Sequence, residues 1–324
     1  MKKIISIILA VILTATLFAG CSNKSKEPNE PAKDKKDGIT VVCSIFPIYD
    51  FCREIMGDKG SIELLLDSKT DMHSYEPTAS DILKISNADL FINIGGESEE
   101  WAEGVIESAA NPDLKVLSLI NAVNAVEEEA LEGMQEEEEE EETGEEEGPE
   151  LDEHVWTSLK NAQMMVQKIS ETLCEIDSEN AEHYKANSNA YAQKLASLEK
   201  QYGETVSAAK RNVLLFADRF PFRYLADDYS LQCFAAFSGC SAESEASFET
   251  MTNLVEKTKE YELPFILIIE GSDGSVAESV SAQTGAQIKV LNSCQSVSKE
   301  DIENGAGYLS IMESNLEVLK EVLN

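Results

Sequence analysis

The sequence predicts an α/β protein with two α/β domains that contain parallel sheets and are joined by one long linker helix. Short apolar runs rich in β-forming residues alternate with helical patterns in both halves of the chain. Strands that are apolar almost throughout are typical of a parallel sheet covered on both faces. The length of 324 residues is about twice the usual ~150 residues of one domain, which allows two such units.

Residues 1–20 are predicted to be a lipoprotein signal peptide. Lys2 and Lys3 precede an apolar stretch over residues 4–19, which is shorter than the ~20 residues of a membrane-spanning helix. Small residues then lead to Cys21, an ending that resembles a bacterial lipobox. We expect lipidation of Cys21, and with it an N-terminal lipid anchor that holds the protein at the extracytoplasmic face of the cell membrane. Residues 21–38 are polar and predict a flexible tether.

The N-terminal α/β domain is predicted over residues 39–157. Strands are expected at 39–46, 62–66, 90–94 and 115–119, with helical patterns after Pro47 and near Ser98.

Residues 158–209 contain no proline and one glycine, and their apolar spacing predicts two linker helices. The second of these helices is long enough to run across both domains. The C-terminal α/β domain is predicted over residues 210–324. Its strands are expected at 212–216, 231–237, 264–270 and 287–291, and an amphipathic helix at about 305–323 closes the chain.

The charge of the chain favours cations as partners and argues against nucleic acid. Lys and Arg number 26 against 61 Asp and Glu, a formal net charge of −35. Residues 127–153 alone hold seventeen acidic residues and no Lys or Arg. Within this stretch, an acidic loop at 127–150 is interpreted either as a solvated, self-repelling segment or as a weak collector of divalent cations.

Six cysteines follow Cys21, and none of them has CxxC spacing. The sequence therefore indicates neither a disulfide pairing nor a zinc knuckle of the Cys type. We expect most of them to be small buried apolar residues.

Only three histidines are present, and two of them lie in loops. His183 has charged neighbours on a predicted helix and is interpreted as a surface residue. His73 lies in residues 71–77 and His154 in residues 152–156, at the expected edges of the domains. Ligands of parallel sheets bind beyond the carboxyl ends of the strands. Taken singly, a loop histidine is more often a surface group, but these two could converge on a divalent ion.

Four segments resemble the zinc/manganese solute-binding family, the cluster A-I metal-binding lipoproteins of ABC importers. They are DMHSYEP at 71–77, the stretch 95–101, DEHVW at 152–156 with Asn161 and Ala162, and YLSIMESNL at 308–316. The resemblance implies two α/β domains joined by one long helix, with Zn²⁺ or Mn²⁺ in the interdomain cleft. It also implies delivery of the metal to a membrane permease, no catalysis, and ligand roles for His73 and His154.

The resemblance places a third ligand at the end of the first strand of the second domain, where this chain has Ala217. Asp218 could supply an oxygen instead, or Arg219 could neutralise it in an ion pair. A fourth ligand is implied after the third strand of that domain, at Glu270 or Asp273. The expected ligand set is therefore His73, His154, Asp218 and Glu270, and Cys240 and Glu243 are further candidates.

These residues favour Zn²⁺, with Mn²⁺ as the alternative metal. The expected function is an extracytoplasmic lipoprotein that captures the metal and delivers it to an ABC-type import permease. The alternatives are a surface adhesin, an acidic cation-buffering protein or an exported zinc hydrolase. The last is disfavoured because the sequence has no HExxH or GxSxG motif.

Overall fold

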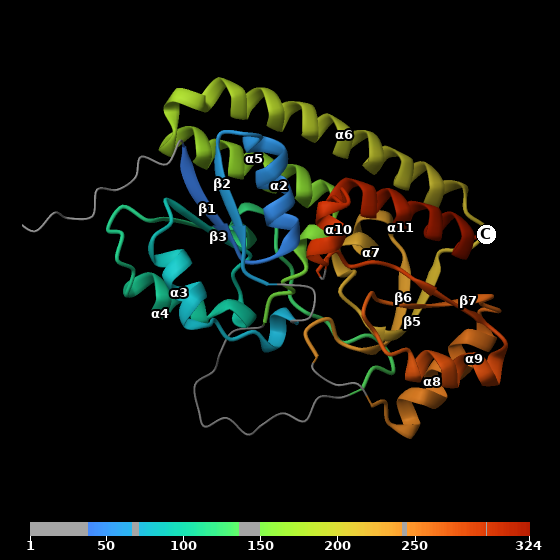
Figure 1. Ribbon diagram of the computed structural model, residues 1–324. Helices are drawn as coiled ribbons and strands as arrows, with labels where there is room; N and C mark the ends of the chain where they lie inside the picture. Colours follow the sequence, from blue (N-terminus) through green and yellow to red (C-terminus); the bar gives the residue numbers. More distant parts are fainter. Residues whose placement is uncertain (1–37, 67–70, 136–149, 242–244, 296) are drawn as a thin grey trace, which may run out of the picture. The chain divides into compact units, whose positions relative to one another are not determined.

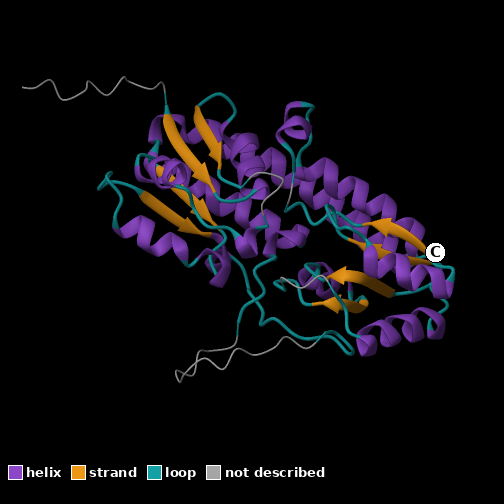
Figure 2. Ribbon diagram, turned by 60° about the horizontal axis from the view of Figure 1, so that its bottom comes forward, coloured by secondary structure: helices purple, strands orange, loops and turns teal. Residues whose placement is uncertain are grey.

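Two parallel sheets of four strands each, with helices packed on their faces, form the fold (Figures 1 and 2). The computed structural model describes residues 38–66, 71–135, 150–241, 245–295 and 297–324. The predicted signal peptide, Cys21, almost all of the predicted tether, residues 136–149 of the acidic loop and Glu243 lie outside the described residues. The predicted class, two α/β units with parallel sheets, is confirmed.

The first lobe is built on a sheet with strand order β2-β1-β3-β4. Its strands are β1 (Ile39–Cys43), β2 (Gly60–Leu64), β3 (Leu90–Asn93) and β4 (Lys115–Ser118), and its helices are α2 (Phe46–Met56), α3 (Ala79–Ser86) and α4 (Trp101–Glu107). The central strands β1 and β3 are buried along almost their whole length, whereas the edge strands β2 and β4 are partly exposed. The near-continuous apolar pattern thus holds for the central strands, because only they have neighbours on both sides.

The second lobe repeats this arrangement with strand order β6-β5-β7-β8. Its strands are β5 (Val213–Arg219), β6 (Gln232–Phe237), β7 (Phe265–Ile268) and β8 (Gln287–Val290), and its helices are α7 (Arg223–Tyr229), α8 (Phe248–Glu260), α9 (Ser275–Thr284), α10 (Lys299–Glu303) and α11 (Tyr308–Val322). Strand β5 continues beyond the predicted end at residue 216, and its register with β6 shifts between Phe216 and Arg219. The irregularity lies in the segment where the family resemblance places a ligand.

Residues 158–209 form the two helices α5 (Leu159–Ile176) and α6 (Ala181–Ala208). Helix α5 begins at Ser158, whose hydroxyl accepts hydrogen bonds from the backbone N–H groups of Lys160 and Asn161. Helix α6 packs against α2 of the first lobe and α11 of the second (Figure 1). The buried Tyr202 of α6 donates a hydrogen bond of 2.6 Å to the carbonyl of Met312 in α11. A single helix therefore braces both lobes.

Buried hydrogen bonds also connect the segment after His154 to the second lobe, and Tyr308 of that lobe to the first. The indole N–H of Trp156 donates to the carbonyl of Ser293 at 2.7 Å. The hydroxyl of Tyr308 donates to the carbonyl of Trp156 at 2.6 Å, and the backbone N–H of Tyr308 donates to Asp50 at 2.7 Å. Trp156 is thereby fixed to Ser293 and Tyr308 of the second lobe.

The six cysteines after Cys21 are all described, and all are free thiols: Cys43, Cys52, Cys174, Cys233, Cys240 and Cys294. Cys43, Cys52 and Cys294 are buried, whereas Cys174, Cys233 and Cys240 are partly exposed, so half of the six, and not most of them, are buried as expected. None of the described helices is both long and apolar enough to cross a bilayer.

We predict that Tyr308→Phe lowers the free energy of unfolding by about 1–2 kcal/mol, because the substitution removes one buried hydrogen bond and leaves the Trp156 carbonyl with one partner fewer. The measurement is urea unfolding followed by circular dichroism. Tyr261→Phe is the matched control, since its hydroxyl meets Gln232 at an exposed position. It should change stability by less than about 0.5 kcal/mol. Equal unfolding midpoints for the two variants would contradict a stabilising role for the Tyr308 hydroxyl.

Candidate metal centre

Two of the three histidines approach one another although 81 residues separate them along the chain. His73 lies in the 3-10 turn Met72–Ser74 after β2, where the Asp71 carboxylate accepts a hydrogen bond of 3.0 Å from the backbone N–H of His73. His154 immediately precedes the 3-10 turn Val155–Thr157, and the Asp152 carboxylate accepts from its backbone N–H at 2.8 Å. The same local arrangement, an aspartate two residues before the histidine, therefore fixes both backbones.

The imidazole rings present their Nε2 atoms to each other at 3.2 Å. The Nδ1 atom of His73 lies 2.7 Å from the hydroxyl of Ser98, and the Nδ1 atom of His154 lies 3.2 Å from the carboxylate of Asp152. The His154 side chain is fully buried, and His73 is half-buried. Each ring is thus oriented by a partner on its outer nitrogen, as is usual for metal-ligating histidines.

The separation of the two Nε2 atoms fits a single metal ion between them. Two nitrogen ligands at 2.0–2.1 Å from a tetrahedral zinc lie ~3.3 Å apart. The observed distance of 3.2 Å therefore matches two adjacent corners of such a tetrahedron.

A thiol completes a group of three candidate ligand atoms. One ring nitrogen of His73, one of His154 and the sulfur of Cys240 all lie within 4.8 Å of one another. Cys240 follows β6, so the group joins a loop of the first lobe, the segment before α5 and a loop of the second lobe. The two loop positions follow the carboxyl ends of parallel strands, where ligands of such sheets bind.

Buried carboxylates surround His154. Asp152 and Glu153 are each about 2% exposed, and Glu128 lies close enough to act on the charge of the ring. Within the described part of the chain, neither Glu128 nor Glu153 forms an ion pair with Lys or Arg. Burial raises the pKa of both Glu153 and Glu128. The surroundings of the histidine pair therefore favour a cation.

The two histidines respond to this environment in opposite ways. Burial, followed by the neighbouring charge of His154, lowers the pKa of His73 to about 3. Burial also opposes protonation of His154, but the hydrogen bond and charge of Asp152, with Glu153 and Glu128, raise its pKa above the usual range. As the pH falls, His154 is therefore protonated before His73.

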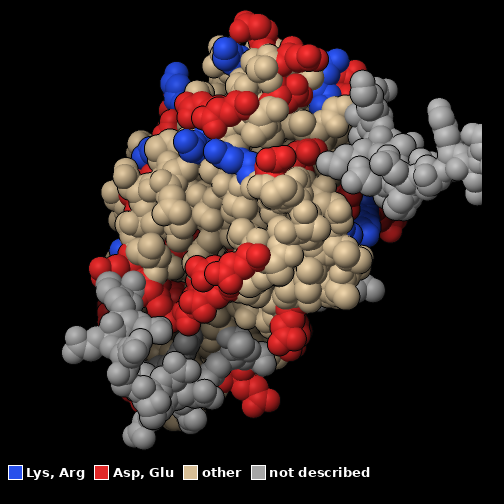
Figure 3. Space-filling model, turned by 90° about the vertical axis from the view of Figure 1, so that its left-hand side faces the viewer, with Lys and Arg blue, Asp and Glu red and all other residues tan. Residues whose placement is uncertain are grey.

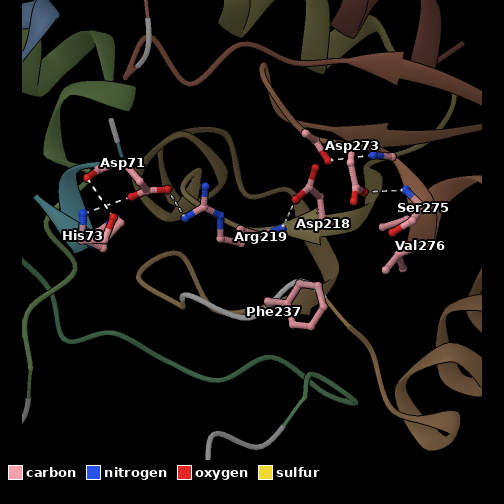
Figure 4. A pocket seen from close by; sticks show the side chains of 12 residues that line it. Asp71, His73, Asp218, Arg219, Phe237, Asp273, Ser275 and Val276 are labelled. Atoms are coloured by element: carbon pink, nitrogen blue, oxygen red, sulfur yellow. Dashed lines mark hydrogen bonds and ion pairs between the residues drawn. The ribbon is translucent and has the colours of Figure 1, made fainter. Parts of the chain in front are cut away.

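Asp218 lies outside the group of three ligand atoms, and its oxygens are engaged by the backbone. One accepts from the N–H of Arg219 at 2.8 Å and the other from the N–H of Ile269 at 3.1 Å. The Arg219 guanidinium forms its ion pair with Asp71. All three side chains, with His73 and Asp273, line a pocket of about 410 Å³ (Figure 4). Figure 4 shows Arg219 extended toward Asp71 and away from Asp218.

Glu270 also lies outside the group, since its two oxygens accept from the backbone N–H and the hydroxyl of Ser293, both at 2.6 Å. Asp273 accepts from the backbone N–H of Ser275 at the start of α9. The third histidine, His183, contacts the carbonyl of Met56 and the amide of Asn187, far along the chain from the pair.

Sequence reasoning did not find Ser98, which orients His73. The only available signal was its position in the 95–101 stretch of the family resemblance. Gly96 has φ of 104°, and a Cβ there would meet a Glu153 oxygen at 2.4 Å. Only glycine allows this close approach, which places the Ser98 N–H 2.9 Å from Glu153.

Comparisons with known proteins identify the family of this chain. A family model described as ZnuA, zinc-uptake complex component A periplasmic, matches residues 41–322. The high-affinity zinc uptake system protein ZnuA of Bacillus subtilis (strain 168) is 33% identical over 309 residues, which cover 95% of this chain and 94% of that protein. The zinc-binding lipoprotein AdcA of Streptococcus pneumoniae (strain ATCC BAA-255 / R6) is 33% identical over 322 residues. That match covers 99% of this chain but only 61% of AdcA.

Among solved structures, the Zn(II)-bound ZnuA-like domain of Streptococcus pneumoniae AdcA superposes with a TM-score of 0.72 at 29% sequence identity. The superposition covers 88% of this chain and 99% of that domain. The family match spans nearly the whole described chain and includes both histidines of the pair. The chain therefore belongs to the ZnuA family, the periplasmic component A of zinc-uptake complexes.

Proposed function

We propose that this chain is a zinc receptor that holds one Zn²⁺ between His73 and His154 and delivers it to an ABC-type import permease. The observation that carries the proposal is the pair of Nε2 atoms 3.2 Å apart, each on a ring oriented from its other nitrogen. The relatives named above as zinc-uptake and zinc-binding proteins support the same assignment. The family is a transport component, and we propose no enzymatic activity.

Zinc is the metal that this site suits best. Imidazole nitrogens are good ligands of zinc, whereas manganese prefers oxygen ligands and binds a given nitrogen site more weakly. The carboxylates engaged by backbone N–H groups, Asp218 and Glu270, are less available to a hard cation than the sequence suggested. We therefore place Mn²⁺ second.

Delivery to the permease and attachment to the membrane are further parts of the proposal. This chain spans 61% of the length of pneumococcal AdcA, so the activity of that whole protein is carried over here only as a proposal. Relatives of the chain are named lipoproteins. With the apolar residues 4–19 before Cys21, this supports lipidation at Cys21 and a location on the extracytoplasmic face of the membrane.

We predict that His73→Ala and His154→Ala each weaken zinc binding, because each variant removes a ligand. Loss of a residue that only hydrogen-bonds to a ligand typically weakens metal binding by ~10–100-fold, and loss of the ligand itself should weaken it more. Competition with a zinc chelator measures the dissociation constant. His183→Ala is the matched control, since this histidine lies outside the group, and it should bind zinc like the parent. If either ligand variant also binds like the parent while keeping its fold, the site assignment is wrong.

We predict that zinc affinity falls as the pH drops through the pKa of His154. A ligating imidazole must be neutral, and the raised pKa of His154 means that protons compete from a higher pH than for an ordinary histidine. His73 stays neutral down to about pH 3, so it does not contribute over the range from pH 8 to 5. Chelator competition at several pH values gives the midpoint.

Asp152→Asn tests whether Asp152 causes the raised pKa of His154, because Asp152 is the carboxylate that raises this pKa most. The midpoint of the affinity curve should move to lower pH in this variant. An affinity that stays constant from pH 8 to 5 in the parent would contradict histidine ligation.

The acidic segment allows a test against a cation-buffering function. On the face drawn in Figure 3, Asp and Glu form several separate clusters, and Lys and Arg lie beside the upper ones. We predict that replacing residues 136–149 with a Gly/Ser link of equal length keeps one tight zinc site, because the described flanks keep their contacts. In these flanks the backbone N–H of Glu128 donates a hydrogen bond to the carbonyl of Glu150, and the backbone N–H of Gln135 donates to the carbonyl of Ala236. Isothermal titration counts the sites; loss of all tight binding would favour the buffering function.

A further inference from the structure

We propose that the Cys240 thiolate is the third protein ligand of the zinc ion, so that two imidazoles and one sulfur hold the metal. This inference rests on the zinc-receptor function proposed above. It departs from the ligand set that the family resemblance implies, because that set contains nitrogen and oxygen donors only.

The positions of the three ligand atoms support a common ion. A sulfur at 2.3 Å and a nitrogen at 2.0–2.1 Å from a tetrahedral zinc lie about 3.6 Å apart. The Cys240 sulfur and the two ring nitrogens lie within 4.8 Å of one another. A movement of about an ångström therefore brings the sulfur to bonding distance, which is within the reach of a rotation about the Cα–Cβ bond of a half-buried side chain.

The backbone at Gly239, next to Cys240, lies against the ring of His154. A Cβ added at Gly239 would lie 2.9 Å from Cε1 and 3.0 Å from Nδ1 of His154, and 3.0 Å from the carbonyl of Phe220. The chain approaches this closely only because residue 239 is glycine. The backbone N–H of Cys240 also donates to Glu128 at 3.3 Å. Two contacts thus fix the loop at the point where the thiol enters the site.

Arg219 ends β5, two residues after Ala217, the position where the family resemblance places a ligand, and its side chain contacts two loops. Its guanidinium pairs with Asp71 and donates to the carbonyl of Ser241 at 3.3 Å. Asp71 fixes the backbone of His73, and Ser241 is the neighbour of Cys240. Arg219 therefore ties the loop that carries the thiol to the loop that carries the first imidazole.

No other donor among the described residues offers the same placement. A search of these residues finds one group of three His, Cys, Asp or Glu ligand atoms, the group that contains Cys240. The oxygens of Asp218 and Glu270 accept hydrogen bonds from Arg219, Ile269 and Ser293 instead. The Cys240 thiol is therefore the described donor best placed to act as the third ligand.

A sulfur ligand has a defined chemical consequence. Zinc binding replaces the S–H bond with a zinc–sulfur bond and releases the proton to solvent. Burial and the charge of Glu128 raise the pKa of the Cys240 thiol, so the empty site carries a neutral thiol. Thiolates are soft donors that select zinc, cadmium and cobalt over manganese. Cys240 therefore sets the preference of the receptor for zinc.

The test uses Co²⁺ as a spectroscopic substitute for zinc on the full chain. The parent should show a thiolate-to-cobalt charge-transfer band in the near ultraviolet, and the band should disappear in Cys240→Ser. Cys233→Ser is the matched control, because Cys233 lies on β6 seven residues earlier and outside the ligand group. It should keep the band. Circular dichroism establishes that each variant is folded.

The same variants are then titrated with Zn²⁺ and Mn²⁺ against a chelator. We expect Cys240→Ser to lose zinc affinity by more than ~10-fold while its manganese affinity changes little, so that the zinc-to-manganese ratio falls. Zinc should also slow alkylation of Cys240, but not of Cys233, in the unmodified parent chain.

The outcomes separate this inference from the function on which it rests. The thiolate ligand is overturned if the cobalt-loaded parent shows no charge-transfer band and if the parent and Cys240→Ser bind zinc with equal, tight affinity. The receptor function would still stand in that case. A parent chain that binds zinc only weakly, and no more tightly than His73→Ala, overturns the receptor function and the thiolate ligand together.

Discussion

The structure depends on two imidazole rings that face each other at 3.2 Å in a largely buried site. In the function proposed above, both nitrogen lone pairs of this pair bind one cation, and the carboxylates around His154 add to the preference for positive charge. Each ring is held from behind, by Ser98 on one side and by Asp152 on the other. The rigidity of this arrangement keeps the ligand atoms near the separation that zinc needs, so little reorganisation accompanies binding.

Three parts of the fold cooperate to form the pair. The parallel sheets direct the loops after β2 and β6 toward the site, helix α6 braces both lobes, and Trp156 and Tyr308 secure the segment that follows His154. A continuous helix is stiffer than a coil linker, so the distance between the lobes is controlled. Metal capture in this architecture relies on loops that a rigid frame holds in register.

Arg219 lies near Ala217, the position where the family resemblance places a ligand, and takes part in the contacts around the proposed metal site. At the end of β5 a cation now bridges Asp71 and the loop after β6, and the neighbouring Asp218 is occupied by backbone N–H groups. This contact of Arg219 is with the carbonyl of Ser241, the neighbour of the proposed ligand Cys240. Exchange of an oxygen or nitrogen ligand for sulfur changes the hardness of the site more than its shape, and selectivity among metals follows hardness.

The sequence by itself determined the fold class, because apolar strands, helical periodicity and turn residues are local signals. All eight strands lie within a few residues of the predicted ranges. It also singled out His73 and His154, since an aspartate two residues earlier and a position after a strand are visible along the chain. Only the tertiary structure shows which other donors lie near the two histidines. Whether Asp218, Glu270 or Cys240 faces the histidines depends on the register shift in β5, on Arg219 and on the close approach at Gly239. These are contacts between residues far apart in sequence, which no local pattern encodes.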